Sequence, residues 1–282
     1  MINFFSLLKL MRPKQWVKNF FVLAPLVFSG LFVKLPSVID ALIAMALFCV
    51  ASSLVYIIND AKDIEKDRLH PTKSQTRPLA SGAVSLSQAF VLMAVLVAVL
   101  VVGCIFKPQV MVVIGFYIAL NLAYTFKLKH EPVLDIFSIA IGFVMRVVAG
   151  SVAISVPISH WMLVTTLSLA LYLASIKRRQ ELLQQGSDSR SVLGKYSVEL
   201  IDRYAEMSAT GALVFYSMFV ATARPELVIT VPIVIFGLFR YWYIVHTVEG
   251  GESPTDALTE DKQLLLSVVL WCAICAYVLL PK

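Results

Sequence analysis

Long apolar runs alternate with short polar intervals along the whole chain. Nine of these runs are close to the roughly 20 residues that a helix needs to cross a bilayer. They span residues 19–33, 38–58, 86–105, 109–126, 133–154, 160–176, 205–223, 226–246 and 264–280. The pattern predicts an all-α, polytopic membrane protein with nine transmembrane helices in a single integral-membrane domain, residues 1–282.

The polar intervals differ in length and charge, and this difference predicts the orientation. Residues 1–18 combine Phe4 and Phe5 with basic residues, as expected for an amphipathic lead-in at the membrane interface. The intervals 59–85 and 177–204 share a side with the N-terminus and are rich in Lys and Arg, whereas the other side holds only Lys34, Lys107, Arg224 and Lys282. Because basic loops stay inside, the N-terminus and these two predicted active-site loops are expected at the cytoplasmic face of the cell (inner) membrane.

The composition agrees with a membrane protein and narrows the class of partner. Hydrophobic residues make up 59% of the chain and charged residues 15%, against about 25% charged residues in soluble domains. A net charge of +6 fits basic loops that meet membrane lipids and anionic substrates, so no nucleic-acid partner is expected. The four histidines are scattered without the spacing of a zinc site.

The polar stretch 59–82 carries the strongest candidate chemistry. If residues 56–67 are helical, four side chains fall on one face, namely Asn59, Asp60, Asp63 and Asp67. Three carboxylates on one stripe repel one another unless a cation lies among them. Oxygen ligands together with substrate phosphates are typical of Mg²⁺. The stretch therefore predicts a Mg²⁺–diphosphate site whose metal-binding and catalytic residues are the three aspartates; the alternative is a solvated acidic helix end.

Arg146 lies near the middle of the fifth apolar run, where an ionisable side chain is costly. One interpretation is an anion-binding side chain that faces a cavity. The alternative is an ion pair with a buried acid such as Asp135 on the same helix. Gly142 and Gly150 flank Arg146 at i−4 and i+4, which permits a close helix contact there.

Three consecutive basic residues, Lys177, Arg178 and Arg179, follow the sixth apolar run. They are typical of a stop-transfer cluster whose side chains reach lipid headgroups. The order of runs and loops nevertheless indicates two similar helical halves around a central cavity open to the cytoplasm. In that arrangement the basic cluster faces the aspartates and would bind a second phosphate group of one substrate.

Further candidate substrate ligands occur in three short segments. The segment before the first run carries Lys14, Lys18 and Asn19, and the alternative for these residues is a plain interfacial anchor. Arg77 lies in a loop that could close over the site. At the end of the fourth run stand Tyr124 and Lys127, which could equally lie in the headgroup region without binding substrate.

These motifs resemble a known family. The pattern NDxxDxxxD at 59–67, on a helix end in a nine-span chain, is similar to the UbiA superfamily of intramembrane prenyltransferases. The resemblance covers essentially the whole chain and implies a helical bundle that uses Mg²⁺. Common members carry a second aspartate-rich motif in the later half. This chain instead has KRRQE at 177–181.

Within the superfamily, the chain resembles the decaprenyl-phosphate phosphoribosyltransferase family through the segments 10–19, 76–82 and 177–182. This resemblance implies transfer of 5-phosphoribose from phosphoribosyl pyrophosphate to a polyprenyl phosphate, with release of pyrophosphate and inversion at ribose C1. It implies Asp60 and Asp63 as metal ligands, Asp67 as a third ligand and Asn59 as their support. The basic candidates would bind phosphate groups.

Two rival functions stay open at this stage. One is a UbiA-type transfer of a prenyl group from a prenyl diphosphate to an aromatic or quinone precursor. The other is a lipid transporter or lipid-binding protein without catalysis, which broken helices with half-helix ends at the bilayer midplane would favour. The sequence leaves the oligomeric state open.

Overall fold

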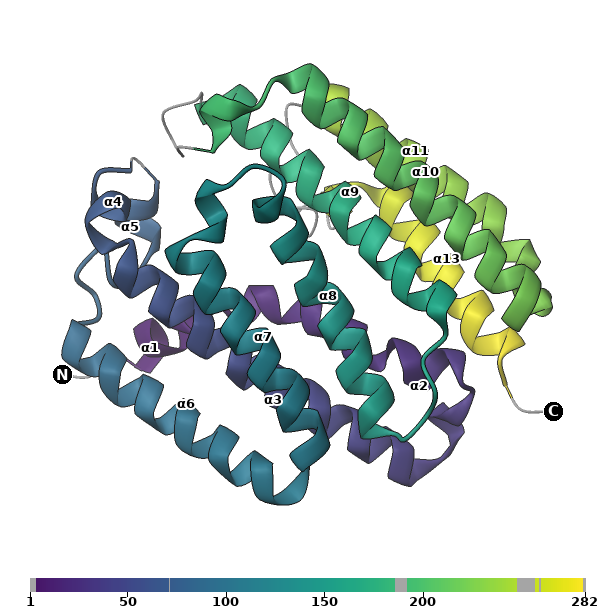
Figure 1. The fold of residues 1–282 in the computed structure, drawn as a ribbon, viewed down its shortest axis with the longest axis horizontal. Helices are drawn as coiled ribbons and strands as arrows, with labels where there is room; N and C mark the ends of the chain where they lie inside the picture. The colour runs from purple at the N-terminus through teal and green to yellow at the C-terminus, as the bar shows by residue number, and fades with distance from the viewer. Residues whose placement is uncertain (1–3, 71, 186–191, 248–256, 259, 281–282) are drawn as a thin grey trace.

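The computed structural model describes residues 4–70, 72–185, 192–247, 257–258 and 260–280 (Figure 1). The α-helices are α1 (Phe4–Leu10), α2 (Ala24–Phe28), α3 (Leu35–Lys62), α4 (Ile64–Arg68), α5 (Lys73–Thr76), α6 (Leu86–Phe106), α7 (Pro108–Phe126), α8 (Leu134–Ala153), α9 (His160–Gln185), α10 (Val198–Ala223), α11 (Val231–Thr247) and α13 (Lys262–Val278). The 3₁₀ helices are η1 (Pro13–Leu23), η2 (Leu31–Val33), η3 (Leu128–His130), η5 (Leu193–Lys195) and η6 (Pro225–Thr230). The described residues contain no strand, which confirms the all-α prediction.

Five segments of the described chain are long and apolar enough to cross a membrane: α3, α6, α7, α8 and the joined η6–α11. The shorter α13 is also apolar. The bounds of α6, α7 and α8 lie within one residue of the predicted runs. The nine spans, their orientation and the central cavity stay predictions.

Both predicted active-site loops contain helix. The interval 59–85 begins with the last turn of α3 and then forms α4 and α5. The interval 177–204 begins inside α9, so Lys177, Arg178 and Arg179 are helical residues. It ends in η5 and the start of α10, and residues 186–191 lie outside the described part.

The first predicted span, 19–33, is not one α-helix. The chain runs as 3₁₀ helix to Leu23, as α-helix over α2, and as 3₁₀ helix again over η2. Pro25, which lacks a backbone N–H, stands at the start of α2, and Gly30 adopts a left-handed conformation at φ 75° before η2.

The 3₁₀ form of η1 sorts its side chains by a period of three, because residues i and i+3 eclipse in such a helix. Trp16, Asn19 and Val22 form one face, which meets the bundle: Asn19 and Val22 are buried, and Trp16 donates to Ser53 Oγ at 3.0 Å. Lys14, Val17 and Phe20 form an exposed face. Gln15, Lys18 and Phe21 form the half-buried third face. Lys14 and Lys18 therefore point in different directions, although an α-helix would align them.

The helices pack as two groups (Figure 1). η1, α3, α6, α7 and the end of α8 share the largest apolar core. α9, α10, α11 and α13 lie together on the other side, and the packing of α8 against α9 joins the two groups. The polar segment between α3 and α6, which holds α4 and α5, lies at the edge of the first group (Figure 1).

Gly150 is required where η1 crosses α8. A Cβ atom at this position would lie 1.8 Å from the carbonyl oxygen of Val22 and 3.2 Å from Cδ of Pro25. The first contact is with backbone, which a rotamer change cannot relieve. The predicted close contact at Gly150 is thus present, and it holds the face of η1 that carries Asn19 against the bundle.

We expect Gly150→Ala to lower the thermal unfolding temperature of the purified protein by about 5 °C, because overpacking costs on the order of 1–3 kcal/mol. Gly115→Ala is the matched control, since an added Cβ there meets nothing within 4 Å. Equal unfolding temperatures for the two variants would contradict the close contact.

Candidate active site

The acidic stretch lies on two short helical segments that meet at Asp63. α3 ends at Lys62 and α4 starts at Ile64, and Asp63 between them leaves the helical conformation at φ −97° and ψ 11°. The single stripe expected for a continuous helix is bent at this point. Asp60 and Asp67 are buried, with 2% and 5% of their surface exposed, whereas Asp63 is only half-buried.

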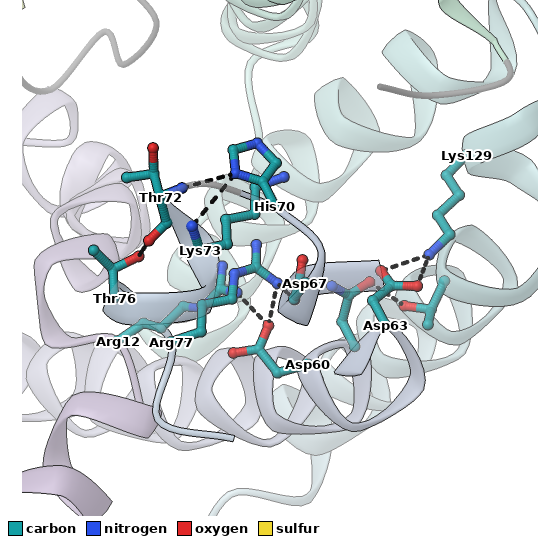
Figure 2. A network of polar contacts seen from close by, with 12 residues as sticks. Arg12, Asp60, Asp63, Asp67, His70, Thr72, Lys73, Thr76, Arg77 and Lys129 are labelled. Atoms are coloured by element: carbon teal, nitrogen blue, oxygen red, sulfur yellow. Dashed lines mark hydrogen bonds and ion pairs between the residues drawn. The ribbon is translucent and has the colours of Figure 1, made fainter. Parts of the chain in front are cut away.

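Asp60 and Asp67 converge on one cation. Arg77 Nη1 donates to Asp60 Oδ1 at 2.7 Å and also to Asp67 Oδ2, and Arg12 Nη2 donates to Asp60 Oδ1 as well (Figure 2). Because both carboxylates contact the same nitrogen, they lie on either side of a single hydrogen-bonding atom. Sequence reasoning proposed Arg77 but missed Arg12, which is 48 residues from Asp60 along the chain.

The turn formed by residues 77–84 positions Arg77 against Asp60 and Asp67. The amide of Ser81 donates to the carbonyl of Arg77 at 2.9 Å, and the amide of Val84 donates to that of Pro78 at 3.0 Å. Gly82 closes the turn at φ 76°, a conformation that L side chains rarely adopt. The predicted loop therefore covers the aspartates with its own arginine.

Asp63 faces another basic residue. Lys129 Nζ contacts both carboxylate oxygens of Asp63 at 2.8 Å, from the turn between α7 and α8 (Figure 2). Lys127, the residue proposed from the sequence, is exposed. The 3₁₀ turn η3 follows Lys127 directly and brings Lys129 toward the acids. In the sequence, the only indication of a role for Lys129 was its closeness to Lys127, the residue that was proposed.

Arg146 and Asn19 form a second polar centre deeper in the first helical group. Arg146 Nε donates to Asn19 Oδ1 at 2.8 Å, and Asn19 Nδ2 donates to Ser52 Oγ on α3 at 3.2 Å. Arg146 also donates to the Gly142 carbonyl at 2.7 Å and to the Tyr117 hydroxyl at 3.1 Å. The alternative of an ion pair between Arg146 and Asp135 is not realised.

Lys18 lies close enough to this centre for the charge of Arg146 to affect its pKa. Burial, together with the positive charges of Arg146 and Arg12, lowers the pKa of Lys18 to about 8. Lys14 lies on the exposed face of η1. Of the two lysines proposed from this segment, the structure brings only Lys18 to the buried cations.

The basic cluster of α9 is surrounded by acids. Arg178 is buried, and it pairs with Asp135 at 3.0 Å and with Glu181. It also donates to the Tyr124 hydroxyl at 3.3 Å, so Tyr124 lies in this network. Arg179 pairs with Asp202 at 2.7 Å. Phosphate binding by Lys177, Arg178 and Arg179 stays a prediction.

Asp135, which the sequence offered as a possible partner of Arg146, belongs to the same network as Arg178. It accepts from the Tyr196 hydroxyl at 2.8 Å, and Tyr196 accepts from the Val133 amide at 2.6 Å. Burial raises the pKa of Tyr196. Val133 has φ 68°, which is unusual for a β-branched residue. The network therefore holds the strained turn before α8, the turn that also carries Lys129.

Comparisons with known proteins identify the family. The UbiA prenyltransferase family matches the chain over residues 22–259. The chain belongs to this family. Decaprenyl-phosphate phosphoribosyltransferase of Corynebacterium glutamicum is 34% identical, over 98% of this chain and 88% of the relative. The enzyme of the same name from Mycolicibacterium smegmatis is 40% identical, over 76% of this chain and 69% of the relative.

Solved UbiA structures support the fold. A UbiA homolog from Archaeoglobus fulgidus, bound to GPP and Mg²⁺, superposes with a TM-score of 0.74 at 18% identity, and the match covers 97% of this chain and 99% of that one. Membership of the family, together with the apolar helices, makes this chain an integral membrane protein.

The acids of this UbiA protein fit a magnesium ion. Arg77 Nη1 lies between one oxygen of Asp60 and one of Asp67, a position in which a metal cation could bind the same two carboxylates. Asp60 and Asp67 supply only oxygen atoms, which Mg²⁺ prefers, and Mg²⁺ commonly takes one or two carboxylates plus substrate phosphates. In the described part of the chain, no group of three or more His, Cys, Asp or Glu side chains is arranged around a metal position. A site of two carboxylates completed by substrate matches this arrangement.

Proposed function

We propose that this protein transfers the 5-phosphoribosyl group of phosphoribosyl pyrophosphate to a polyprenyl phosphate similar to decaprenyl phosphate. The observation that carries the proposal is the set of basic side chains around two buried acids: Arg12 and Arg77 contact them, and Lys129 contacts the neighbouring Asp63. Such surroundings suit a donor that carries several phosphate groups. The names of the two phosphoribosyltransferase relatives point to the same donor and acceptor.

Asp60 and Asp67 would hold Mg²⁺ in this proposal, with Asp63 as a third ligand once it leaves Lys129, and Asn59 would support them. Asn59 Oδ1 accepts a 3.4 Å hydrogen bond from Thr125 on α7, which ties the last turn of α3 to α7. The bound ion would neutralise charge on the departing pyrophosphate. Arg12, Arg77 and Lys129 would then exchange carboxylate oxygens for phosphate oxygens of the donor.

The reaction needs no general base, because the acceptor phosphate is already ionised at neutral pH. An acceptor phosphate oxygen forms the bond to ribose C1. The C1–O bond to pyrophosphate breaks, and the electron pair leaves with pyrophosphate. The acidic side chains nearby favour the positive charge that develops on the ribose. Attack opposite the leaving group inverts C1 and gives a β-linked product.

The remaining candidates have supporting places in this proposal. Lys14 and Lys127 are exposed, and at the membrane interface they would attract the acceptor phosphate. Tyr124 touches Arg178, and Lys177 to Arg179 follow on α9. The proposal places the N-terminus and all of these groups at the cytoplasmic face of the inner membrane.

The test incubates purified protein in detergent with ribose-labelled phosphoribosyl pyrophosphate, decaprenyl phosphate and Mg²⁺. We expect a labelled lipid, no labelled lipid with a chelator, and recovery when Mg²⁺ is added in excess. Wild-type protein that makes no labelled lipid under these conditions would refute the proposal.

Prenyl transfer to an aromatic acceptor is the second candidate, because the matching family is named for prenyltransferases. It predicts that labelled prenyl diphosphate, and not labelled phosphoribosyl pyrophosphate, is consumed with release of pyrophosphate. Running the two labelled donors side by side separates the two functions.

A further inference from the structure

Arg146 is a buried cation without a counter-charge. None of the ion pairs between described residues includes it, and its three hydrogen-bond acceptors are neutral. A guanidinium has five N–H donors, so two of them have no acceptor in these contacts. Three aromatic rings surround its Cζ atom at 4.9 to 5.6 Å, those of Phe48, Tyr117 and Phe143. A buried charge in such surroundings is costly unless an anion joins it.

Lys18 brings a second positive charge to the same place. It lies one 3₁₀ turn before Phe21 on the same face of η1. The Phe21 ring meets the Phe143 ring at 5.1 Å, and the Arg146 guanidinium lies 5.3 Å from the Phe143 ring centre. Lys18 makes no hydrogen bond or ion pair with another described residue. Two like charges in a poorly polar environment repel each other, and an anion between them removes that cost.

We propose that Lys18 and Arg146 form a deep phosphate-binding subsite that takes the 5-phosphate of the sugar donor. The inference rests on the proposed function and makes it more specific. Asn19 links Arg146 to Ser52, which precedes Asp60 by eight residues on α3, or about 12 Å along the helix axis. The subsite thus lies about two helical turns below the acids. A pentose with phosphate groups at carbons 1 and 5, one at each end of the molecule, can bridge them.

The positive charge of Lys18 and Arg146 favours phosphoribosyl pyrophosphate over a prenyl diphosphate as the donor. A prenyl diphosphate carries its charge at one end only, and its other end would require an apolar chamber. Phosphoribosyl pyrophosphate is anionic at both ends, so one end matches the acids, which would hold Mg²⁺, and the other end matches the two cations. The acceptor lipid has its tail in the hydrocarbon layer and its phosphate at the interface, which leaves the deep subsite to the donor. Arg178 and Arg179 are already paired with acids.

The test measures steady-state kinetics of Lys18→Gln and Arg146→Gln with both substrates, and inhibition by ribose 5-phosphate and by inorganic pyrophosphate. We expect the donor KM and the inhibition constant of ribose 5-phosphate to rise about 10- to 100-fold, the effect of losing a charge-assisted phosphate contact. The acceptor KM and the inhibition constant of pyrophosphate should stay unchanged. Lys18→Arg, which keeps the charge, should recover donor binding.

Lys34→Gln, at an exposed position at the start of α3, is the matched control for loss of a lysine charge. If Arg146→Gln fails to fold, Lys18→Gln decides, because Lys18 is only half-buried. A rise in the acceptor KM instead of the donor KM would assign the subsite to the lipid phosphate and overturn the inference. If the wild-type protein transfers phosphoribose but the variants keep its donor KM and its inhibition constant for ribose 5-phosphate, the inference is overturned too. Absence of transfer by wild type would refute the proposed function itself.

Discussion

Asp60→Asn is expected to lower kcat/KM for phosphoribosyl transfer on the order of 100-fold or more. Asp60 is almost fully buried and shares a cation with Asp67. Asn keeps the size of the side chain but removes the charge that would bind Mg²⁺, and loss of charge stabilisation at such a site commonly has this magnitude. Asp67→Asn should have a similar effect. Asp63→Asn should have a smaller one, because Asp63 is turned toward Lys129.

Asp40→Asn is the matched control for this prediction. Asp40 lies on the same helix and is also paired with a basic side chain, that of Lys107, but near the opposite end of α3. The decisive measurement is kcat/KM across a Mg²⁺ titration, with unfolding temperatures recorded for each variant. Wild-type activity of Asp60→Asn at limiting Mg²⁺ would remove Asp60 from the metal site.

The apolar runs predicted most of the fold because run length and helix length are fixed by the same membrane. The bounds of α6 and α7 follow the runs closely, because both helix starts can be recognised from the local sequence. Ser85 forms a capping box with Gln88 at the start of α6, and Pro108 is the first residue of α7. The first run gave no such signal. It overlaps the 3₁₀ helix η1 (Pro13–Leu23), which packs against α3 and α8. An α-helical period of 3.6 over residues 14–18 would place Lys14 and Lys18 on one face, which is incorrect.

The acidic motif and Arg77 were predictable, whereas the contacts of Arg12 and Lys129 with the acids were not. The spacing of Asp60 and Asp67 is local, so it is visible in the sequence. Arg12 and Lys129 reach the acids from 48 and 66 residues away along the chain. Only the packing of η1 and of the α7–α8 turn against α3 determines these contacts.

The cluster at 177–179 shows why residue type alone is ambiguous. Consecutive Lys and Arg residues fit a phosphate site, a headgroup anchor and a buried ion-pair network equally well. Asp135 lies 43 positions earlier than Arg178, and the packing of α8 against α9 brings the two together. The sequence named both residues but gave no reason to pair them.

Arg178→Met is expected to destabilise the protein by about 3–5 kcal/mol, because it leaves Asp135 and Glu181 without their buried partner. For a chain of this size, the thermal unfolding temperature should fall on the order of 10 °C. Arg203→Met is the matched control. Arg203 pairs with Glu199 in an exposed i, i+4 contact, with exposed fractions of 72% and 76%, and such pairs contribute about 0.5 kcal/mol or less.

A triple replacement separates the structural role of Arg178 from phosphate binding. When Arg178→Met is combined with Asp135→Leu and Glu181→Leu, no buried charge of this network remains unpaired. Replacing a buried ionic network by apolar side chains is often neutral or stabilising, so the unfolding temperature should recover. If transfer activity recovers with it, Arg178 acts through packing alone. If the triple variant is stable but its donor KM is higher than that of the wild type, the guanidinium of Arg178 also binds phosphate. The cluster at 177–179 then has the phosphate-binding role that the sequence predicted.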